Sequence, residues 1–264
     1  HQMVSRLVVQ VTAPDMSQKG SGAHVKRALL LDITRLCLFF GRERTLDVVL
    51  PQLITFLNDR DNGLRADFFD CITGVCTFIG SLSVDLIIMP CIEVALIDVE
   101  ERVIARALHC LTTLCQLGLF KKAQLVERAE MTAPLLFHPS VRIRDAVTVL
   151  IAVVAKQLGS PDVHAFLAPV LRPYIKPGRK LLGLELGLET IRTALKKPVA
   201  RKAFDDAMYA AEKGEDGQSS YYASASLSSS KQSKGAKGGS AKGKQAGGRS
   251  GEHSGADDGT RSAA

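Results

Sequence analysis

Tryptophan is absent from this 264-residue chain, and aromatic residues make up only 5% of it. Single-stranded nucleic acids are usually bound on aromatic side chains, so the composition disfavours that class of binding platform. Long apolar runs are missing too. The most apolar stretch, residues 147–155, is about half the length of a membrane span and is interrupted by Thr148. No secretory signal is visible, so we expect the six cysteines to be reduced thiols in the cytosol.

Catalytic motifs are also missing. The sequence contains no Gly-x-Ser-x-Gly, no His-Glu-x-x-His and no His-Arg-Asp or Asp-Phe-Gly triplet. The run Lys19–Gly22 resembles a shortened phosphate loop, but no apolar strand precedes it. Adjacent acids such as Glu100 and Glu101 would point about 100° apart on a helix, which makes a catalytic pair unlikely to form. The sequence therefore predicts a chain with no catalytic, cofactor-binding or metal-binding residues.

The net charge of +7 is spread along the chain and does not form a block. Basic residues alternate with acidic ones, as in Arg42-Glu43-Arg44. Such a mixed surface is typical of a solvated face, so we expect no specific nucleic-acid partner.

The strongest feature is an internal repeat of 39 residues. When the sequence is shifted by this period, apolar positions fall on apolar positions. Within each unit the matching positions are spaced four and then three residues apart, which is the spacing of one face of an α-helix. The three predicted core columns are Leu29, Phe68, Ala107 and Ala146; Ile33, Ile72, Leu111 and Leu150; and Leu36, Val75, Leu114 and Val153.

Turn residues repeat with the same period. Gly41 and Gly80 end two of the expected helices, and Pro51 and Pro90 would start or kink two others. Asp59 would cap the helix that follows it. Each unit is therefore a pair of helices, and the expected helices span residues 2–13 and 25–40, 46–57 and 64–79, 85–96 and 103–117, 122–136 and 141–158, and a looser final unit of 163–172, 179–195 and 199–211.

A helical pair of this length is typical of HEAT and armadillo repeats. One pair cannot bury its own apolar face, so the pairs should stack into a solenoid with a long binding surface. We expect an all-α solenoid of about five helical pairs over residues 1–211. Residues 212–264 lose the apolar period and become rich in Ser, Gly and Lys, which predicts a disordered tail.

The cysteines follow the repeat. Cys37, Cys76 and Cys115 occupy one column, and Cys71 and Cys110 occupy another. Because zinc sites use closely spaced Cys pairs instead, these residues are predicted to be core positions.

Basic residues recur near the start of the second helices, and they leave two interpretations open. They could pair with Asp59 or Asp98 of neighbouring repeats, or they could form a partner-binding edge. The candidate residues for such an edge are Lys26, Arg27, Arg65, Arg142 and Arg144.

Two segments, Ile33–Arg42 and Ile54–Asp59, resemble a known family. They are similar to the regulatory, protein-kinase-like subunit of the class III phosphatidylinositol 3-kinase complex, a vacuolar protein sorting component. Further matching segments are Phe68–Asp70, Cys115–Leu119, His138–Pro139, Ile143–Arg144, Val153–Ala155, Lys197–Arg201 and Phe204–Asp205.

The resemblance implies a central HEAT segment that scaffolds the lipid kinase catalytic subunit and a Beclin-type coiled-coil protein in autophagy and endosomal sorting. It also implies a cytoplasmic location, with membrane association only through the complex. The family's serine/threonine kinase motifs are missing here, so no catalytic residue is carried over, and we expect the chain to be a fragment. A generic HEAT adaptor is the alternative.

Overall fold

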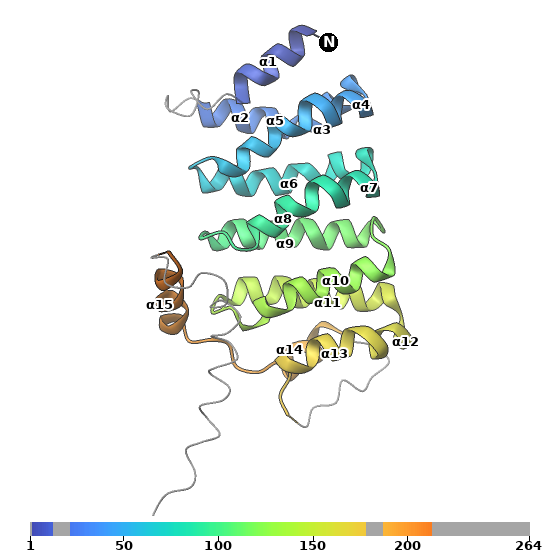
Figure 1. The fold of residues 1–264 in the computed structure, drawn as a ribbon, viewed down its shortest axis with the longest axis vertical. Coiled ribbons are helices and arrows are strands. Elements are labelled where there is room, and N and C mark those ends of the chain that lie inside the picture. Colours follow the sequence, from blue (N-terminus) through green and yellow to red (C-terminus); the bar gives the residue numbers. More distant parts are fainter. Residues whose placement is uncertain (1, 13–21, 178–186, 213–264) are drawn as a thin grey trace, which may run out of the picture.

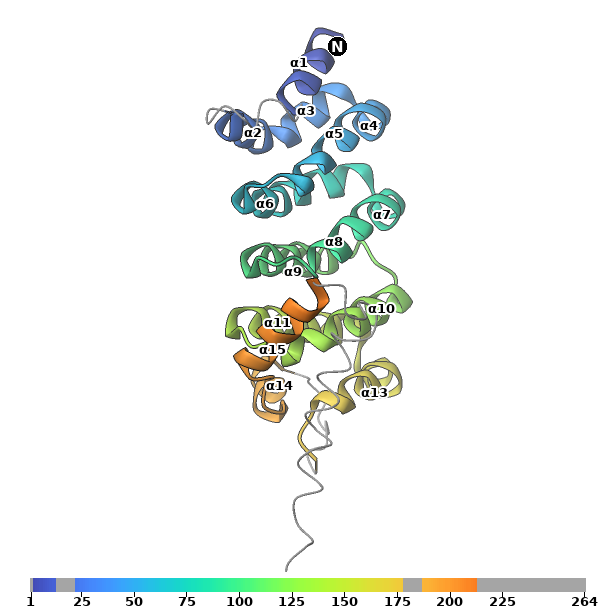
Figure 2. The ribbon, with the colours of Figure 1, turned by 60° about the vertical axis from the view of Figure 1, so that its left-hand side comes forward.

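The computed structural model describes residues 2–12, 22–177 and 187–212, and in these ranges the chain is an α-solenoid. Helices stack in two layers along the long axis of the molecule (Figures 1 and 2). We call the layer of first helices in each pair the A layer and the layer of second helices the B layer. The all-α solenoid predicted from the repeat is confirmed.

After the first, the helices of the A layer change type along their length. Helix α1 (Gln2–Thr12) comes first and contacts α2 and α5. The other A helices are α4 (Arg42–Arg44) with η2 (Thr45–Val49), α5 (Leu50–Ile54) and η3 (Thr55–Asn58); α7 (Ser81–Ser83) with η4 (Val84–Ile88) and α8 (Met89–Ala95); α10 (Lys122–Thr132) with η5 (Ala133–Phe137); and α12 (Ser160–Asp162) with η6 (Val163–Leu167), α13 (Ala168–Leu171) and η7 (Arg172–Tyr174).

The B layer consists of straighter helices. They are α2 (Gly22–Leu31) with α3 (Ile33–Phe40), α6 (Asn62–Ile79), α9 (Glu101–Gln116), α11 (Val141–Leu158) and α14 (Leu188–Ala194). The last described helix, α15 (Arg201–Glu212), leaves the stack and lies beside the turns that join A to B helices (Figure 2).

Glycine and proline explain the repeated bends. Gly41, Gly80 and Gly159 end B helices at φ of 80°, 83° and 82° with ψ near 165°, a region that is open almost only to glycine. Pro51 and Pro90 each follow a π-helical segment, η2 or η4. Proline has no N–H to donate to the preceding turn, and the wider π turn accommodates its ring.

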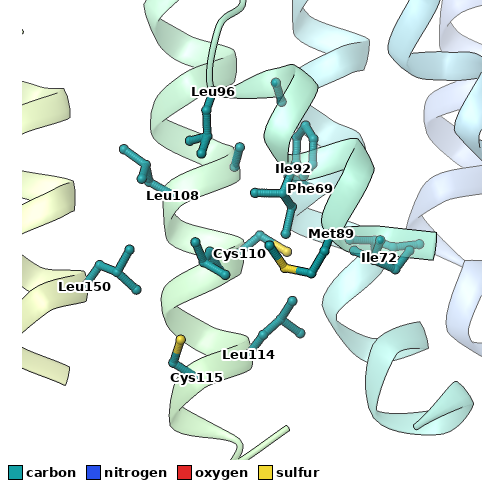
Figure 3. Packing of buried hydrophobic residues seen from close by; sticks show 14 of the residues in the cluster. Phe69, Ile72, Met89, Ile92, Leu96, Leu108, Cys110, Leu114, Cys115 and Leu150 are labelled. Carbon is teal, nitrogen blue, oxygen red and sulfur yellow. The ribbon is translucent and has the colours of Figure 1, made fainter. Parts of the chain in front are cut away.

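The core runs continuously between repeats because each central B helix is packed on both sides. Helix α9 contacts α6 on one side and α11 on the other. Figure 3 shows side chains of α9 between those of α11 on one side and those of α6 and of its own partner α8 on the other. The labelled ones include Leu108, Cys110, Leu114 and Cys115 from α9, Leu150 from α11, Phe69 and Ile72 from α6, and Met89 and Ile92 from α8.

The predicted core columns lie in this interior, with different degrees of burial. Eight of their named positions are buried: Ile33, Phe68, Ile72, Val75, Ala107, Leu111, Leu114 and Leu150. Leu29, Leu36, Ala146 and Val153 are half-buried and pack against the edge of the core. In α2 the buried face is centred nearer to Leu30, which is 2% exposed, than to Leu29.

One local prediction was wrong, and two others fall partly outside the described residues. The helix expected at 25–40 begins at Gly22 and is interrupted at Asp32, and both parts contact α6. The helix expected at 179–195 is described only over α14, because residues 178–186 lie outside the described ranges. Helix α14 ends where Leu195 pairs with Ile175 in an isolated antiparallel bridge. The tail predicted over 212–264 lies outside the described residues except for Glu212.

We expect Leu111→Asp to lower the free energy of unfolding by roughly 3–5 kcal/mol, since it puts a charge into a site where the leucine has 0% exposure. The matched control is Leu86→Asp, the same change at a side chain that is 67% exposed. Urea unfolding followed by far-UV circular dichroism measures both. Equal midpoints for the two variants would contradict a continuous core at α9.

Candidate functional site

The candidate basic edge lies along the turns that join A helices to B helices. Its first residue, Lys26, is only 3% exposed, and its ammonium group lies 2.8 Å from a carboxylate oxygen of Asp59. The same carboxylate accepts a hydrogen bond from the backbone N–H of Asp61. Lys26 therefore ties α2 to the turn of the next repeat and is not offered to a partner.

Arg65 repeats this arrangement one unit later. Its Nε and Nη2 atoms each donate to Asp98 at 2.9 Å, and both side chains are 16% exposed. Its Nη1 donates to the carbonyl of Asp59. The carboxylate of Asp98 raises the pKa of Arg65. This fork-like pair fixes two adjacent turns relative to each other.

Arg144 occupies the corresponding position in α11 but has a different partner. Its Nη1 donates to the carbonyls of His138 and Pro139, both at 2.7 Å. Arg27 pairs with Asp61 and Asp67 across the interface with α6. Of the five candidate residues only Arg142 is exposed and has no interaction recorded in the described structure. The contacts thus favour inter-repeat pairing for the edge.

Asp59 does not cap the helix that follows it, which corrects the prediction. The cap of α6 is Asp61, whose Oδ1 accepts from the N–H groups of Gly63 and Leu64. Asp59 and Asp98 instead accept from the N–H two residues further on and from the basic side chains described above.

The cysteines are free thiols inside the helix layers. Cys76, Cys110 and Cys115 are buried, and burial raises the pKa of Cys110 and Cys115 to about 12. A thiol with a raised pKa is a poor nucleophile and metal ligand at neutral pH. Over the described ranges, no three His, Cys, Asp or Glu side chains are grouped so that they could hold a metal ion. Nor does any helix there have the length and apolarity to cross a membrane.

Sequence patterns missed a polar cluster where α15 meets the stack. Its centre is His138, which is buried at 3% exposure and whose Nδ1 accepts from the N–H of Ser140 at the start of α11. Its ring packs edge-on against Phe204 of α15, and Arg201 pairs with Glu101. Burial lowers the pKa of His138 to about 4.

A second missed cluster joins two A helices. Arg128 of α10 is 12% exposed, and its Nη2 lies 2.7 Å from a carboxylate oxygen of Asp85. Glu93 and Glu127 lie at 3.7 and 3.9 Å from the same guanidinium group. The ring of Phe120 lies 5.8 Å from it.

We expect Asp98→Asn to lower the free energy of unfolding by about 1–2 kcal/mol, because Arg65 would lose its charged partner in a largely buried place. The matched control, Asp32→Asn, removes a carboxylate whose pair with Arg35 is exposed on both sides, and it should change nothing measurable. Chemical unfolding of the parent and both variants measures these changes in the free energy of unfolding. A loss of unfolding free energy no larger than that of the control would show that the Arg65–Asp98 pair does not stabilise the fold.

His138 should make the fold sensitive to acid. Its pKa is about 4 in the folded chain and about 6.5 when unfolded, so the unfolded state binds more protons between these values. Stability should therefore be present above pH 6.5 and decline as the pH falls toward 4. His138→Asn keeps a cap acceptor without this titration. Between pH 7 and 5 the parent should lose about 1–2 kcal/mol more than the variant. Parallel losses would contradict this assignment.

Comparison with known proteins identifies the family. The family described as "PIK3R4-like, middle domain" matches residues 1–208. The chain is 45% identical over 161 residues to "Probable serine/threonine-protein kinase vps15" of Dictyostelium discoideum. It is 40% identical over 201 residues to "Serine/threonine-protein kinase VPS15" of Arabidopsis thaliana. A "non-specific serine/threonine protein kinase" of Candida glabrata is 33% identical over 205 residues.

These matches cover 61%, 76% and 77% of the chain but only 8%, 13% and 14% of the three relatives. The chain thus spans a small part of the length of the curated relatives that it matches. The part that it matches is a middle domain, and the resemblance noted in the sequence is confirmed. The chain belongs to the PIK3R4-like family, regulatory subunits of the class III phosphatidylinositol 3-kinase complex, and corresponds to the middle domain of that family.

Proposed function

We propose that this chain is a protein-interaction scaffold within the class III phosphatidylinositol 3-kinase complex. The observation that carries the proposal is the family match over residues 1–208, on a fold that is a continuous stack of helices. A solenoid of this kind offers extended surfaces on its two layers and along its edges, which suits the holding of several partners at fixed separations.

The partners in this proposal are the lipid kinase catalytic subunit and a Beclin-type coiled-coil protein. In this role the chain would act in autophagy and endosomal sorting, in the cytoplasm, and would reach membranes only through the complex. It would perform no catalysis. Phosphoryl transfer needs a phosphate-cradling loop, a lysine, metal-binding acids and a positioned base, and the sequence offers no such set. The kinase activity named for the relatives would then belong to other parts of their chains.

The internal ion pairs support a scaffold in a particular way. Lys26–Asp59 and Arg65–Asp98 each cross from one repeat to the next, with both partners at most 16% exposed. Such contacts restrict the angle between neighbouring repeats, most strongly at Arg65–Asp98, because this bidentate pair tolerates little rotation. A fixed angle keeps distant binding surfaces at a constant separation.

The test is an internal deletion in the full-length relative of which this chain is the middle domain. Removal of the segment that corresponds to residues 25–158 should abolish co-purification of the lipid kinase and the coiled-coil protein, because linked sites on one scaffold depend on each other. Proteolysis and circular dichroism establish that the remaining domains are folded. Recovery of the complete complex, with lipid kinase activity at the parent level, would reject the scaffold function.

A further inference from the structure

One A helix exposes an apolar face that no described segment covers. Along α7, η4 and α8 and the turn after them, large apolar side chains point away from the core. They lie three or four residues apart, with exposed Pro90 among them, so they form one stripe of a helix. The members of this stripe are Leu82 at 69% exposure, Leu86 at 67%, Val94 at 65% and Ile97 at 65%.

The stripe is peculiar to this repeat and is not a requirement of the fold. One period earlier, the same structural positions on α4 to η3 are all polar, and all of them are exposed. The pairs of equivalent residues, 39 apart, are Leu82 and Glu43, Leu86 and Asp47, Val94 and Thr55, and Ile97 and Asn58. Polar residues at these positions are compatible with the fold. The apolar residues of the stripe are therefore not explained by folding alone.

One flank of the stripe is acidic. On the side of α10, the carboxylates of Asp85, Glu93 and Glu127 surround the single guanidinium of Arg128, which leaves an excess of negative charge. Glu93 and Glu127 are 51% and 62% exposed. On the side of α4 and η2, the exposed carboxylates of Glu43 and Asp47 are balanced by exposed Arg42 and Arg44.

Charge decides among the surfaces that could cover such a face. A second copy of the chain would bring like charges together at the rim, which is unfavourable. A membrane with anionic lipids would be repelled in the same way. A protein helix with an apolar face and Lys or Arg along one side would satisfy the stripe and its acidic flank together. Residues 82–97 extend over roughly 22 Å at 1.5 Å per residue, which matches about four turns of a partner helix.

We propose that the exposed apolar stripe on α7 to α8 binds a basic amphipathic helix of a protein partner. The inference rests on the proposed scaffold function and specifies where on the A layer one partner docks and with what chemistry. Apolar side chains of the partner pack between the leucines and Val94, while its basic side chains reach the carboxylates of Glu93 and Glu127.

The test uses the full chain and two synthetic helical peptides of about 18 residues, a length that covers the stripe. Both peptides carry leucines at helical spacing; one has lysines beside them and the other has glutamates. The decisive variant transplants the residues of the preceding repeat: Leu82→Glu, Leu86→Asp, Val94→Thr and Ile97→Asn. Leu38→Thr, a change at an exposed B-layer leucine to the residue found one period later, is the control.

The lysine peptide should bind the parent chain and the control equally, and the transplanted variant should weaken binding at least about tenfold in fluorescence anisotropy. The glutamate peptide should bind the parent at least about tenfold less tightly than the lysine peptide. The transplanted variant adds negative charge, so purely electrostatic binding of the lysine peptide would strengthen. A thermal melt that matches the parent's establishes that this variant is folded.

Several results would overturn the proposal: no binding of the lysine peptide, equal affinity for parent and transplanted variant, or no preference between the peptides. Stripe-dependent dimerisation in sedimentation equilibrium would show a second copy as the occupant. Stripe-dependent binding to phosphatidylserine vesicles would show a lipid surface.

The internal deletion separates the two proposals. If the complex survives the deletion but the peptide still needs the stripe, only the scaffold function fails; if the complex needs the segment but the peptide results are negative, only the docking inference fails.

Discussion

The structure depends on the burial of B helices between their neighbours. No helical pair here encloses its own core. Phe68, Phe69 and Leu111 reach 0% exposure because the repeats before and after supply the missing walls. Each repeat is therefore stable only within the stack, and what the molecule offers to partners is the outer surface of a continuous stack.

Electrostatic contacts refine this stack. The pairs of Lys26 with Asp59 and of Arg65 with Asp98 are shielded from solvent, whereas Arg35 with Asp32 is open to it. The shielded pairs join different repeats across the turns, and an ion pair held away from solvent is weakened less by water and salt than an exposed one. Apolar burial thus holds the repeats together, while a few charges define how each is rotated on the next.

Periodicity in the sequence predicted the solenoid, most of its helices and the B-helix end glycines, because burial and backbone conformation are local consequences of spacing. It could not predict the break at Asp32, the buried site of His138 or the cluster around Arg128. Each of these depends on contacts between segments far apart in the chain, such as His138 with Phe204. For the basic edge, the sequence left ion pairing and partner binding open, and only side-chain geometry separates Arg65 from Arg142. The sequence does carry a signal for the stripe on α7 to α8, because its apolar positions are polar at the equivalent positions of the preceding repeat.

The A layer around α7 to α8, as we propose it, is a binding surface on a rigid stack. Hydrogen exchange on the full-length relative, alone and in the assembled lipid kinase complex, tests it most directly. Slower exchange in the complex, concentrated in the segment equivalent to residues 81–97 with α9 and α11 unchanged, is the predicted result. Unchanged exchange at that segment, or protection confined to the B layer, would contradict the claim.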